Sequence, residues 1–323
     1  MPMGDPAPTP GTPQSTVPKR LFPDGSAWYR DISGAARDFE SAKMIDTVAK
    51  NGGFGMGEMR IGFEFELVTA DGNAPMIALT PAATFFRPDC DEMPVPLPLG
   101  GALRGEASYQ CTLHGECHLL VHHLPTNRLY EMWSADVTNG VLSAGCQAVW
   151  DLTRVYSPIG RGSNCASADA AGMPIAALLF TADEVAAGEI PHALRFNLPV
   201  NRMRKGVYVA PATQSNSNAS GNFYAPPMGA RFRLRADYPV AALSPGGQVV
   251  ARALQRYGMF LSDAGPKALT ARSDRSTTAK WTAAPGGGPL LGERDLAAIQ
   301  ITDFDVVDGG DRIRFAGACL REP

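Results

Sequence analysis

Histidine and acidic side chains gather in one short stretch, residues 117–134 (CHLLVHHLPTNRLYEMWS). Two apolar runs flank a Leu-Pro-Thr-Asn turn, which predicts a β-hairpin. With a connecting loop of two or four residues, one face holds His118, His122, Glu131 and Trp133. A loop of three or five residues would move Glu131 and Trp133 to the other face.

These histidines could bind a metal in two ways. The helical spacing of His114, His118 and His122 would stack three imidazoles for zinc, but the intervening LLV and the following proline favour strand. In a strand, imidazoles facing a carboxylate bind zinc, manganese or iron. If a metal is bound, we assign it to His118, Glu131 and His192. Surface histidines without a ligand, His123 among them, are the alternative.

A second set of titratable side chains lies within residues 167–196, namely Asp169, Asp183, Glu184, Glu189 and His192. A carboxylate and an imidazole at a strand edge can act as general acid and base, and two neighbouring carboxylates suit glycoside hydrolysis. We therefore predict a catalytic group of Glu131, Asp169, Glu189 and His192. Structural roles stay open: solvated helix caps for Asp183 and Glu184, a turn-forming side chain for Asp169, and a core position for His192.

Three arginines alternate along one strand face, at Arg231, Arg233 and Arg235. Guanidinium groups bind carboxylates bidentately, so on a concave face this row would suit an acidic polysaccharide. On a convex face it is a solvated strand surface. We predict substrate contacts from Arg231, Arg233, Trp133, Trp150 and Tyr257. The tryptophans would stack on sugar rings, and Tyr257 near His192 would permit elimination unless it packs on the core side of its helix.

Charge and motif content exclude several classes of protein. The net charge is only −3, so neither nucleic acid nor an anionic membrane surface is indicated as a partner. No apolar run reaches the roughly 18 residues of a membrane-spanning helix. The sequence has no GxSxG, Walker or strand-following GxGxxG motif, which disfavours α/β-hydrolases and nucleotide enzymes.

The elements that position these residues are predicted to be short strands joined by turns. The 323 residues include 34 Gly and 27 Pro, and both penalise helix interiors. This pattern predicts a mainly β fold, a β-sandwich or jelly roll with a few decorating helices. Residues 1–18 are Pro/Thr-rich and predict a linker or disordered N-terminus. A single domain with an N-terminal arm and long loops is expected over 19–323.

Individual elements follow from periodicity and capping. We expect helices from Ser33 to about Lys50, over 245–257 after Ser244, and near 293–300. A long loop is expected at 84–106 and a mobile one at 270–288. Alternation predicts strands at 59–68, 148–152, 193–200, 205–211, 230–238, 259–265, 303–307 and 312–317.

Six cysteines lie at 90, 111, 117, 146, 165 and 319, without the CxxC spacing of a zinc ribbon. An even, dispersed set predicts up to three disulfides in an oxidising compartment. Buried free thiols in a cytosolic protein are the alternative. We expect Cys146 to pair with Cys165, and Cys90 with Cys111 or Cys117.

Several of these segments, taken in order, resemble blocks shared by a group of mostly uncharacterised secreted bacterial proteins. The likeness spans most of residues 21–263 and is weaker after 265. Because such proteins are associated with polysaccharide-degrading bacteria, the resemblance implies secretion and action on carbohydrate. It includes the positions of His118 and Glu131. The blocks are LFP…W…DIS (Leu21–Ser33), H-L-x-V with LYE (His118–Glu131), SADAAGxPI (Ser167–Ile175), DEVxxGEIxHALRF (Asp183–Phe196), PPMGxRxRL (Pro226–Leu234) and RYGMxxxD (Arg256–Asp263).

These observations together predict a secreted carbohydrate-active enzyme of the glycoside hydrolase type, extracellular or periplasmic, acting on a polysaccharide. One carboxyl group would serve as acid and another as base or nucleophile. No cofactor is required, and a divalent metal ion enters only in the alternative of a metal-dependent oxidative enzyme or a lyase. A non-catalytic carbohydrate-binding protein is the other alternative. The oligomeric state does not follow from the sequence.

Overall fold

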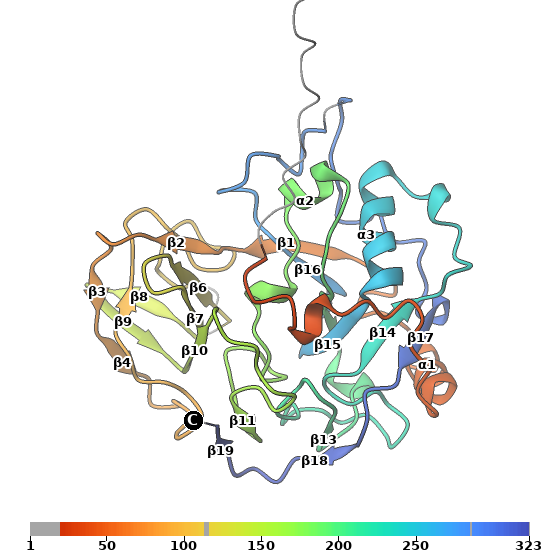
Figure 1. Ribbon diagram of the computed structural model, residues 1–323, viewed down its shortest axis with the longest axis horizontal. Coiled ribbons are helices and arrows are strands. Elements are labelled where there is room, and N and C mark those ends of the chain that lie inside the picture. The colour runs from red at the N-terminus through yellow and green to blue at the C-terminus, as the bar shows by residue number, and fades with distance from the viewer. Residues whose placement is uncertain (1–19, 113–115, 285, 323) are drawn as a thin grey trace, which may run out of the picture.

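The fold centres on a six-stranded sheet in a computed structural model that describes residues 20–112, 116–284 and 286–322. β1 runs parallel to β16 and β12 parallel to β15, whereas the other neighbours are antiparallel. Adjacent strands in this sheet come from distant parts of the chain (Figure 1). In spatial order the strands are β1 (Ile61–Phe65), β16 (Leu269–Arg272), β12 (Leu194–Leu198), β15 (Met259–Ala264), β14 (Arg231–Leu234) and β17 (Phe304–Val307).

A four-stranded sheet lies at the other end of the molecule (Figure 1). Its two middle strands form the hairpin that the sequence predicts, with a four-residue loop and His118 paired with Trp133. This register confirms that His118, His122, Glu131 and Trp133 share one face. The strand order is β10 (Cys146–Asp151), β7 (Arg128–Trp133), β6 (His118–His123) and β2 (Val68–Ala70).

Smaller sheets and three α-helices complete the described architecture. A three-stranded sheet joins β4 (Leu79–Pro81), β9 (Val141–Ala144) and β8 (Asp136–Thr138), and three strand pairs join β3 (Met76–Ile77) to β5 (Val95–Pro96), β11 (Gly162–Ser163) to β19 (Leu320–Arg321), and β13 (Val207–Tyr208) to β18 (Ile313–Arg314). The helices are α1 (Ser41–Lys50), α2 (Ala182–Ala187) and α3 (Pro245–Arg256). In the described part of the chain, no helix is long and apolar enough to cross a membrane.

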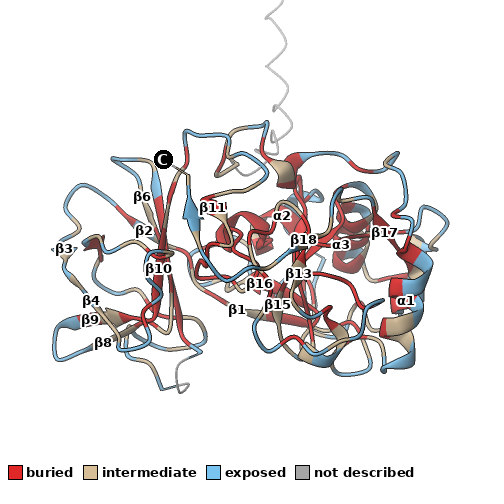
Figure 2. Cartoon of the chain, turned by 90° about the horizontal axis from the view of Figure 1, so that it is seen from below, coloured by how far each residue is buried: buried red, intermediate tan, exposed pale blue. Residues whose placement is uncertain are grey.

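The four-stranded sheet buries both of its faces. One face, with Leu120, Leu129 and Trp150, belongs to the main hydrophobic core. The opposite face, with Leu119 and Met132, packs into a second core that includes side chains of the small three-stranded sheet. Figure 2 shows the resulting continuous band of buried strands. Glu131 points toward the main core, because it alternates with Met132 along β7.

The expectation of a mainly β chain with few helices is confirmed. The strand order does not establish a sandwich or jelly roll, because the largest sheet includes parallel pairs. The helix predicted over 245–257 is present as α3, with Ser244 capping it through a bond from the Gly247 N–H at 3.2 Å. The loop predicted at 84–106 is irregular apart from β5. The linker predicted at 1–18 lies outside the described residues.

Two element predictions are wrong, and a third is correct only in part. The first helix begins only at Ser41, because the Asp38 carboxylate accepts the Glu40 N–H at 2.8 Å and turns the chain. Residues 293–300 form successive turns rather than a helix. The loop predicted at 270–288 is irregular over 273–284 and 286–288, but its first three residues belong to β16. Buried Trp281 fixes it to this strand by donating from Nε1 to the Arg272 carbonyl at 2.9 Å.

All six cysteines form disulfides, but none of the expected pairs occurs. The bonds are Cys90–Cys146, Cys111–Cys117 and Cys165–Cys319. Spacing cannot choose among the 15 pairings that six cysteines allow. The three bonds indicate an oxidising compartment, extracellular or periplasmic.

The Cys165–Cys319 bond is expected to contribute most to stability, because it closes the longest loop, with a sequence separation of 154. Replacing both cysteines by serine should lower the free energy of unfolding by about 2–4 kcal/mol. Urea denaturation would measure it. The matched double replacement of Cys111 and Cys117, separated by only six residues, should cost less, and an equal or larger cost would contradict the prediction.

Candidate functional site

A buried arginine in the six-stranded sheet holds two carboxylates. Arg195, on β12, donates from Nε to Asp169 Oδ1 at 2.9 Å. Its Nη2 lies 2.9 Å from the same oxygen and also donates to Asp263 Oδ2. Both carboxylates therefore contact one guanidinium nitrogen. Nη1 donates to Asn197 Oδ1 at 3.1 Å and to Thr270 Oγ1 at 3.4 Å. These five residues are called the Arg195 cluster below.

Three adjacent strands and one turn bring the Arg195 cluster together. Alternation along β12 places Arg195 and Asn197 on the face opposite Leu194, Phe196 and Leu198, which are all buried in the main core. Asn197 pairs in register with Asp263 of β15, and Thr270 belongs to β16. The cluster is thus held by the sheet itself, which positions side chains more firmly than loops do.

The turn that contains Asp169 is stabilised by backbone groups and by the Ser167 hydroxyl. The Asp169 carboxylate is therefore available to accept hydrogen bonds from Arg195. The Gly172 N–H donates to the Asp169 carbonyl at 2.9 Å, and the Asp169 N–H donates to Ser167 Oγ at 3.0 Å. Gly172 has a φ of +78°, and a Cβ there would lie 1.8 Å from Thr213 Oγ1, so glycine is required. The alternative turn-forming role of the Asp169 side chain does not occur.

The two carboxylates of the Arg195 cluster differ in their surroundings. The Asp169 side chain is 1% exposed and that of Asp263 is 21% exposed. Burial raises the pKa of Asp169 well above its ordinary value, the charge of Arg195 opposes this rise, and the charge of Asp263 adds to it. Among the described residues, Asp169 Oδ2 has no hydrogen-bond partner. Asp169 is therefore suited to carry a proton near neutral pH.

Aromatic Phe65 links the Arg195 cluster to the predicted metal ligand His118. The guanidinium carbons of Arg195 and Arg104 lie 5.3 Å and 4.7 Å from its ring centroid, and the His118 ring lies at 5.4 Å. Burial lowers the pKa of His118 to about 3, and both arginines add to this effect. His118 is therefore neutral. Its ring nitrogens face the carbonyls of Glu116 and Ala168, each at 3.2 Å.

Glu131 is fully enclosed in the main core. Its carboxylate accepts the Trp150 indole N–H and the Ile175 N–H, each at 3.0 Å, and the Ala176 N–H at 2.7 Å. Burial raises its pKa to about 7 despite these donors. The carboxylate fastens the Ile175–Ala176 backbone to the four-stranded sheet, and the surrounding side chains separate it from solvent.

His192 forms a buried pair with Glu184, away from the Arg195 cluster. Its Nε2 lies 3.2 Å from Glu184 Oε1, and its Nδ1 lies 2.8 Å from the Ala193 carbonyl. Glu184 also closes the capping box of α2 with Thr181. The predicted role of Glu184 as a helix cap is therefore correct. The prediction that this cap is solvated is wrong, because the residue is buried. The charge of Glu184 beside Nε2, added to the acceptors at both ring nitrogens, favours the doubly protonated imidazolium.

Protonated His192 is expected to make folding stability fall as pH rises. Burial alone would lower the pKa of His192. The charge of Glu184 and the hydrogen bonds to Glu184 and Ala193 together outweigh this effect and raise the pKa. The stabilisation is therefore complete below the unfolded-state pKa of about 6.5 and is lost as pH passes the raised folded-state pKa. Urea denaturation of wild type and His192→Gln at several pH values isolates this effect. A stability difference that stays constant with pH would refute it.

The predicted catalytic residues do not converge on one site. Glu131 and Asp169 act electrostatically on each other, but Glu189 lies outside, with its side chain about half exposed and 3.5 Å from Arg256. The proposed metal ligands His118, Glu131 and His192 do not gather either. Among the described residues, the only close group of three candidate ligand side chains includes the Cys111–Cys117 disulfide, whose sulfurs are bonded to each other.

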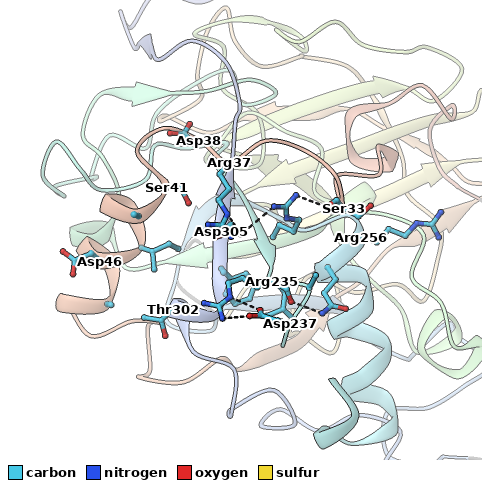
Figure 3. Close-up of a pocket in the computed structure, with 18 of the residues that line it drawn as sticks. Ser33, Arg37, Asp38, Ser41, Asp46, Arg235, Asp237, Arg256, Thr302 and Asp305 are labelled. Atoms are coloured by element: carbon cyan, nitrogen blue, oxygen red, sulfur yellow. Dashed lines mark hydrogen bonds and ion pairs between the residues drawn. The ribbon is translucent and has the colours of Figure 1, made fainter. Parts of the chain in front are cut away.

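A cavity of about 1090 Å³ lies between α1, α3, the edge strand β17 and its neighbour β14. Most of its charged side chains form ion pairs, as Figure 3 shows for Arg37 with Asp305 (2.9 Å) and Arg235 with Asp237 (3.0 Å). Arg233, predicted to contact substrate, lines this cavity and donates to the Ile32 carbonyl at 2.7 Å. This cavity therefore offers mostly neutralised charges.

A second cavity of about 720 Å³ contains two other predicted contact residues, Trp150 and Arg231. We call it the Arg231 cavity and define it by Trp28, Trp150, Tyr156, Arg231 and Phe260, with Asp24 and Asp308 also in its lining. The predicted arginine row is thus divided between two cavities, so it forms no continuous binding face. Of the three arginines only Arg235 is exposed, so a solvated surface describes one end of the row.

The remaining predicted contact residues lie elsewhere. Trp133 is half-buried, with its ring centroid 5.9 Å from that of Phe86. Tyr257 is buried in the main core directly after α3, as its alternative packing role anticipated. Sequence reasoning missed Arg195 and Asp263. A signal was present, because an arginine inside an apolar strand needs an acidic partner. Arg195 is the last residue but one of the block that ends in HALRF, and Asp263 is the last residue of RYGMxxxD.

Comparisons of this chain with protein-family models, curated proteins and solved structures find no match.

Proposed function

We propose that the chain is a secreted protein that acts on a polysaccharide and hydrolyses its glycosidic bonds at the Arg195 cluster. The observation that carries the proposal is the pair Asp169 and Asp263 on one guanidinium nitrogen. Glycoside hydrolysis needs two nearby carboxyl groups in different protonation states. The enclosed Asp169 favours the protonated form, and the partly exposed Asp263 is the one that solvent reaches.

Each carboxyl group takes a role that its surroundings support. Asp263 is the base or nucleophile at the sugar, since it is the partly exposed carboxylate of the pair and accepts a hydrogen bond from Arg195 Nη2. Asp169 is the acid that protonates the leaving oxygen, and water adds across the broken bond. Because Asp169 is 1% exposed, the turn from Ser167 to Gly172 must move aside for the glycosidic oxygen to reach it.

Two further parts of the proposal have their own support. Secretion is supported by three disulfides. A sandwich-like scaffold is supported by the packing of the four-stranded sheet against both cores.

Digestion of a panel of polysaccharides, with products read by mass spectrometry, tests the proposed reaction. We expect products with intact sugar residues plus the elements of water. Products that lack the elements of water would mark elimination, and products that lack a pair of hydrogens would mark oxidation. Either result would contradict hydrolysis.

Carbohydrate binding without cleavage is the second candidate function. The burial of Glu131 favours this second function. Glu131 was predicted to be catalytic, but its carboxylate accepts backbone N–H groups of Ile175 and Ala176 and so has a structural role. Retardation in affinity gels without release of products from any glycan would select this function over hydrolysis.

A further inference from the structure

The Arg231 cavity contains an unusual buried charge. The described residues include four buried arginines, at 161, 195, 204 and 231. The first three each form an ion pair with an aspartate or glutamate. Arg231 is 4% exposed, and within the described part of the chain no carboxylate lies within ion-pair distance of it. A buried charge without an opposite partner is costly.

Backbone carbonyls satisfy only part of the Arg231 guanidinium. Nε donates to the Tyr257 carbonyl at 2.8 Å, Nη1 to the Ala27 carbonyl at 3.2 Å, and Nη2 to the Arg30 carbonyl at 2.9 Å. A guanidinium has five N–H groups, so each Nη keeps one more donor. Burial lowers the pKa of Arg231 to about 9, and the charge of Arg30 adds to the effect. The charge of Asp31 opposes these two effects, and a bound anion would oppose them further.

A second donor in the same cavity has no acceptor. Trp28 lines the cavity, and its buried indole Nε1 has no hydrogen-bond partner among the residues described. The two acidic residues of the lining are exposed and have partners of their own. Asp24 pairs with Arg20 at 2.8 Å, and Asp308 accepts the Gly310 N–H at 2.9 Å. The buried side chains of the lining thus offer donors and a positive charge.

We infer that the Arg231 cavity is a binding site for the carboxylate of an acidic sugar, a uronic acid residue of the polysaccharide. Arg231 binds the carboxylate through its remaining Nη donors, and the Trp28 N–H binds a second oxygen. Apolar ring surface from Tyr156 and Phe260 lines the same space and suits the C–H faces of a sugar ring. The choice of a sugar rests on the proposed function, whereas the choice of a carboxylate rests on Arg231.

Titration calorimetry with galacturonate oligosaccharides tests the inference, with neutral galactose oligosaccharides of equal length as the comparison. We expect the wild type to prefer the acidic series, and Arg231→Lys to weaken that binding by about ten- to a hundredfold, because lysine cannot reproduce the guanidinium fork. Trp28→Phe removes one donor and retains a ring, so it should weaken binding several-fold.

Arg204→Lys serves as the matched control, because Arg204 is also buried but pairs with Glu40 and does not line this cavity. It should leave uronate binding unchanged. Circular dichroism checks that each variant is folded. If Arg231→Lys does not fold, the result for Trp28→Phe decides the test. Equal affinity for acidic and neutral sugars, or full uronate binding by the altered cavity, would overturn the inference.

The outcomes separate the inference from the proposed reaction. Cleavage of glycans without a preference for uronates would leave hydrolysis standing and refute the Arg231 site. Tight uronate binding without release of any product would support the Arg231 site and refute hydrolysis.

Discussion

Asp263→Asn is expected to reduce glycosidic cleavage by about a hundred- to ten-thousandfold while the protein stays folded. This is the range of rate that a positioned acid or base supplies. Asparagine retains the size of the side chain and its oxygen can still accept a bond from Arg195, but it can neither attack the sugar nor take a proton. Initial rates of product release on the most readily cleaved polysaccharide would measure the change.

Asp91→Asn is a suitable control for this result. Asp91 is also a partly buried aspartate bonded to a buried arginine, Arg161, at 2.6 Å, but it lies outside the Arg195 cluster. Its replacement should lower stability and leave the rate per folded molecule near that of the wild type. If Asp263→Asn cleaves as fast as this control, Asp263 is not the catalytic carboxylate.

Arg195→Met is expected to destabilise the fold by about 3–5 kcal/mol, the cost of removing one partner from a buried ion pair. Methionine fills most of the space but leaves Asp169 and Asp263 without their cation. Because protonation relieves an unpaired carboxylate, the loss should be smaller at acidic pH than at neutral pH. Urea denaturation at two pH values would measure both quantities.

Two further variants make the Arg195 result specific. Arg256→Met removes an exposed arginine that pairs with Asp31 and Glu189, and it should change stability by less than about 1 kcal/mol. Adding Asp263→Asn to Arg195→Met should recover part of the loss, because the carboxylate left without its cation is then absent. A loss for Arg195→Met no larger than that for Arg256→Met would refute the proposed energetics.

The pattern of apolar and turn-forming residues in the sequence predicted those features of the site that are determined by residues close together in the chain. Alternation predicted that His118 and Glu131 share one face of the hairpin if its turn has two or four residues, and the structure has the four-residue turn. The turn around Asp169 was likewise visible from Gly172. In each case the determining contacts lie within about twenty residues of one another, so periodicity and turn chemistry carry the information.

The partners of Asp169 could not be predicted in the same way. Arg195 and Asp263 meet through parallel pairing of β12 with β15, where the register shifts between Phe196 and Asn197. A shift of one residue reverses which side chains share a face, and no local signal locates it. The burial of Arg231 was equally hidden, because its carbonyl partners belong to residues 27, 30 and 257.

The disulfide connectivity has a consequence for how this protein is made. Cys90 bonds to Cys146, although Cys111 and Cys117 are translated between them. A chain that oxidises its thiols in order of emergence would join Cys90 to Cys111 first, and thiolate attack would then have to exchange that bond for the native one. Efficient production therefore calls for a host compartment with disulfide isomerase activity, since an oxidant alone would trap mispaired chains.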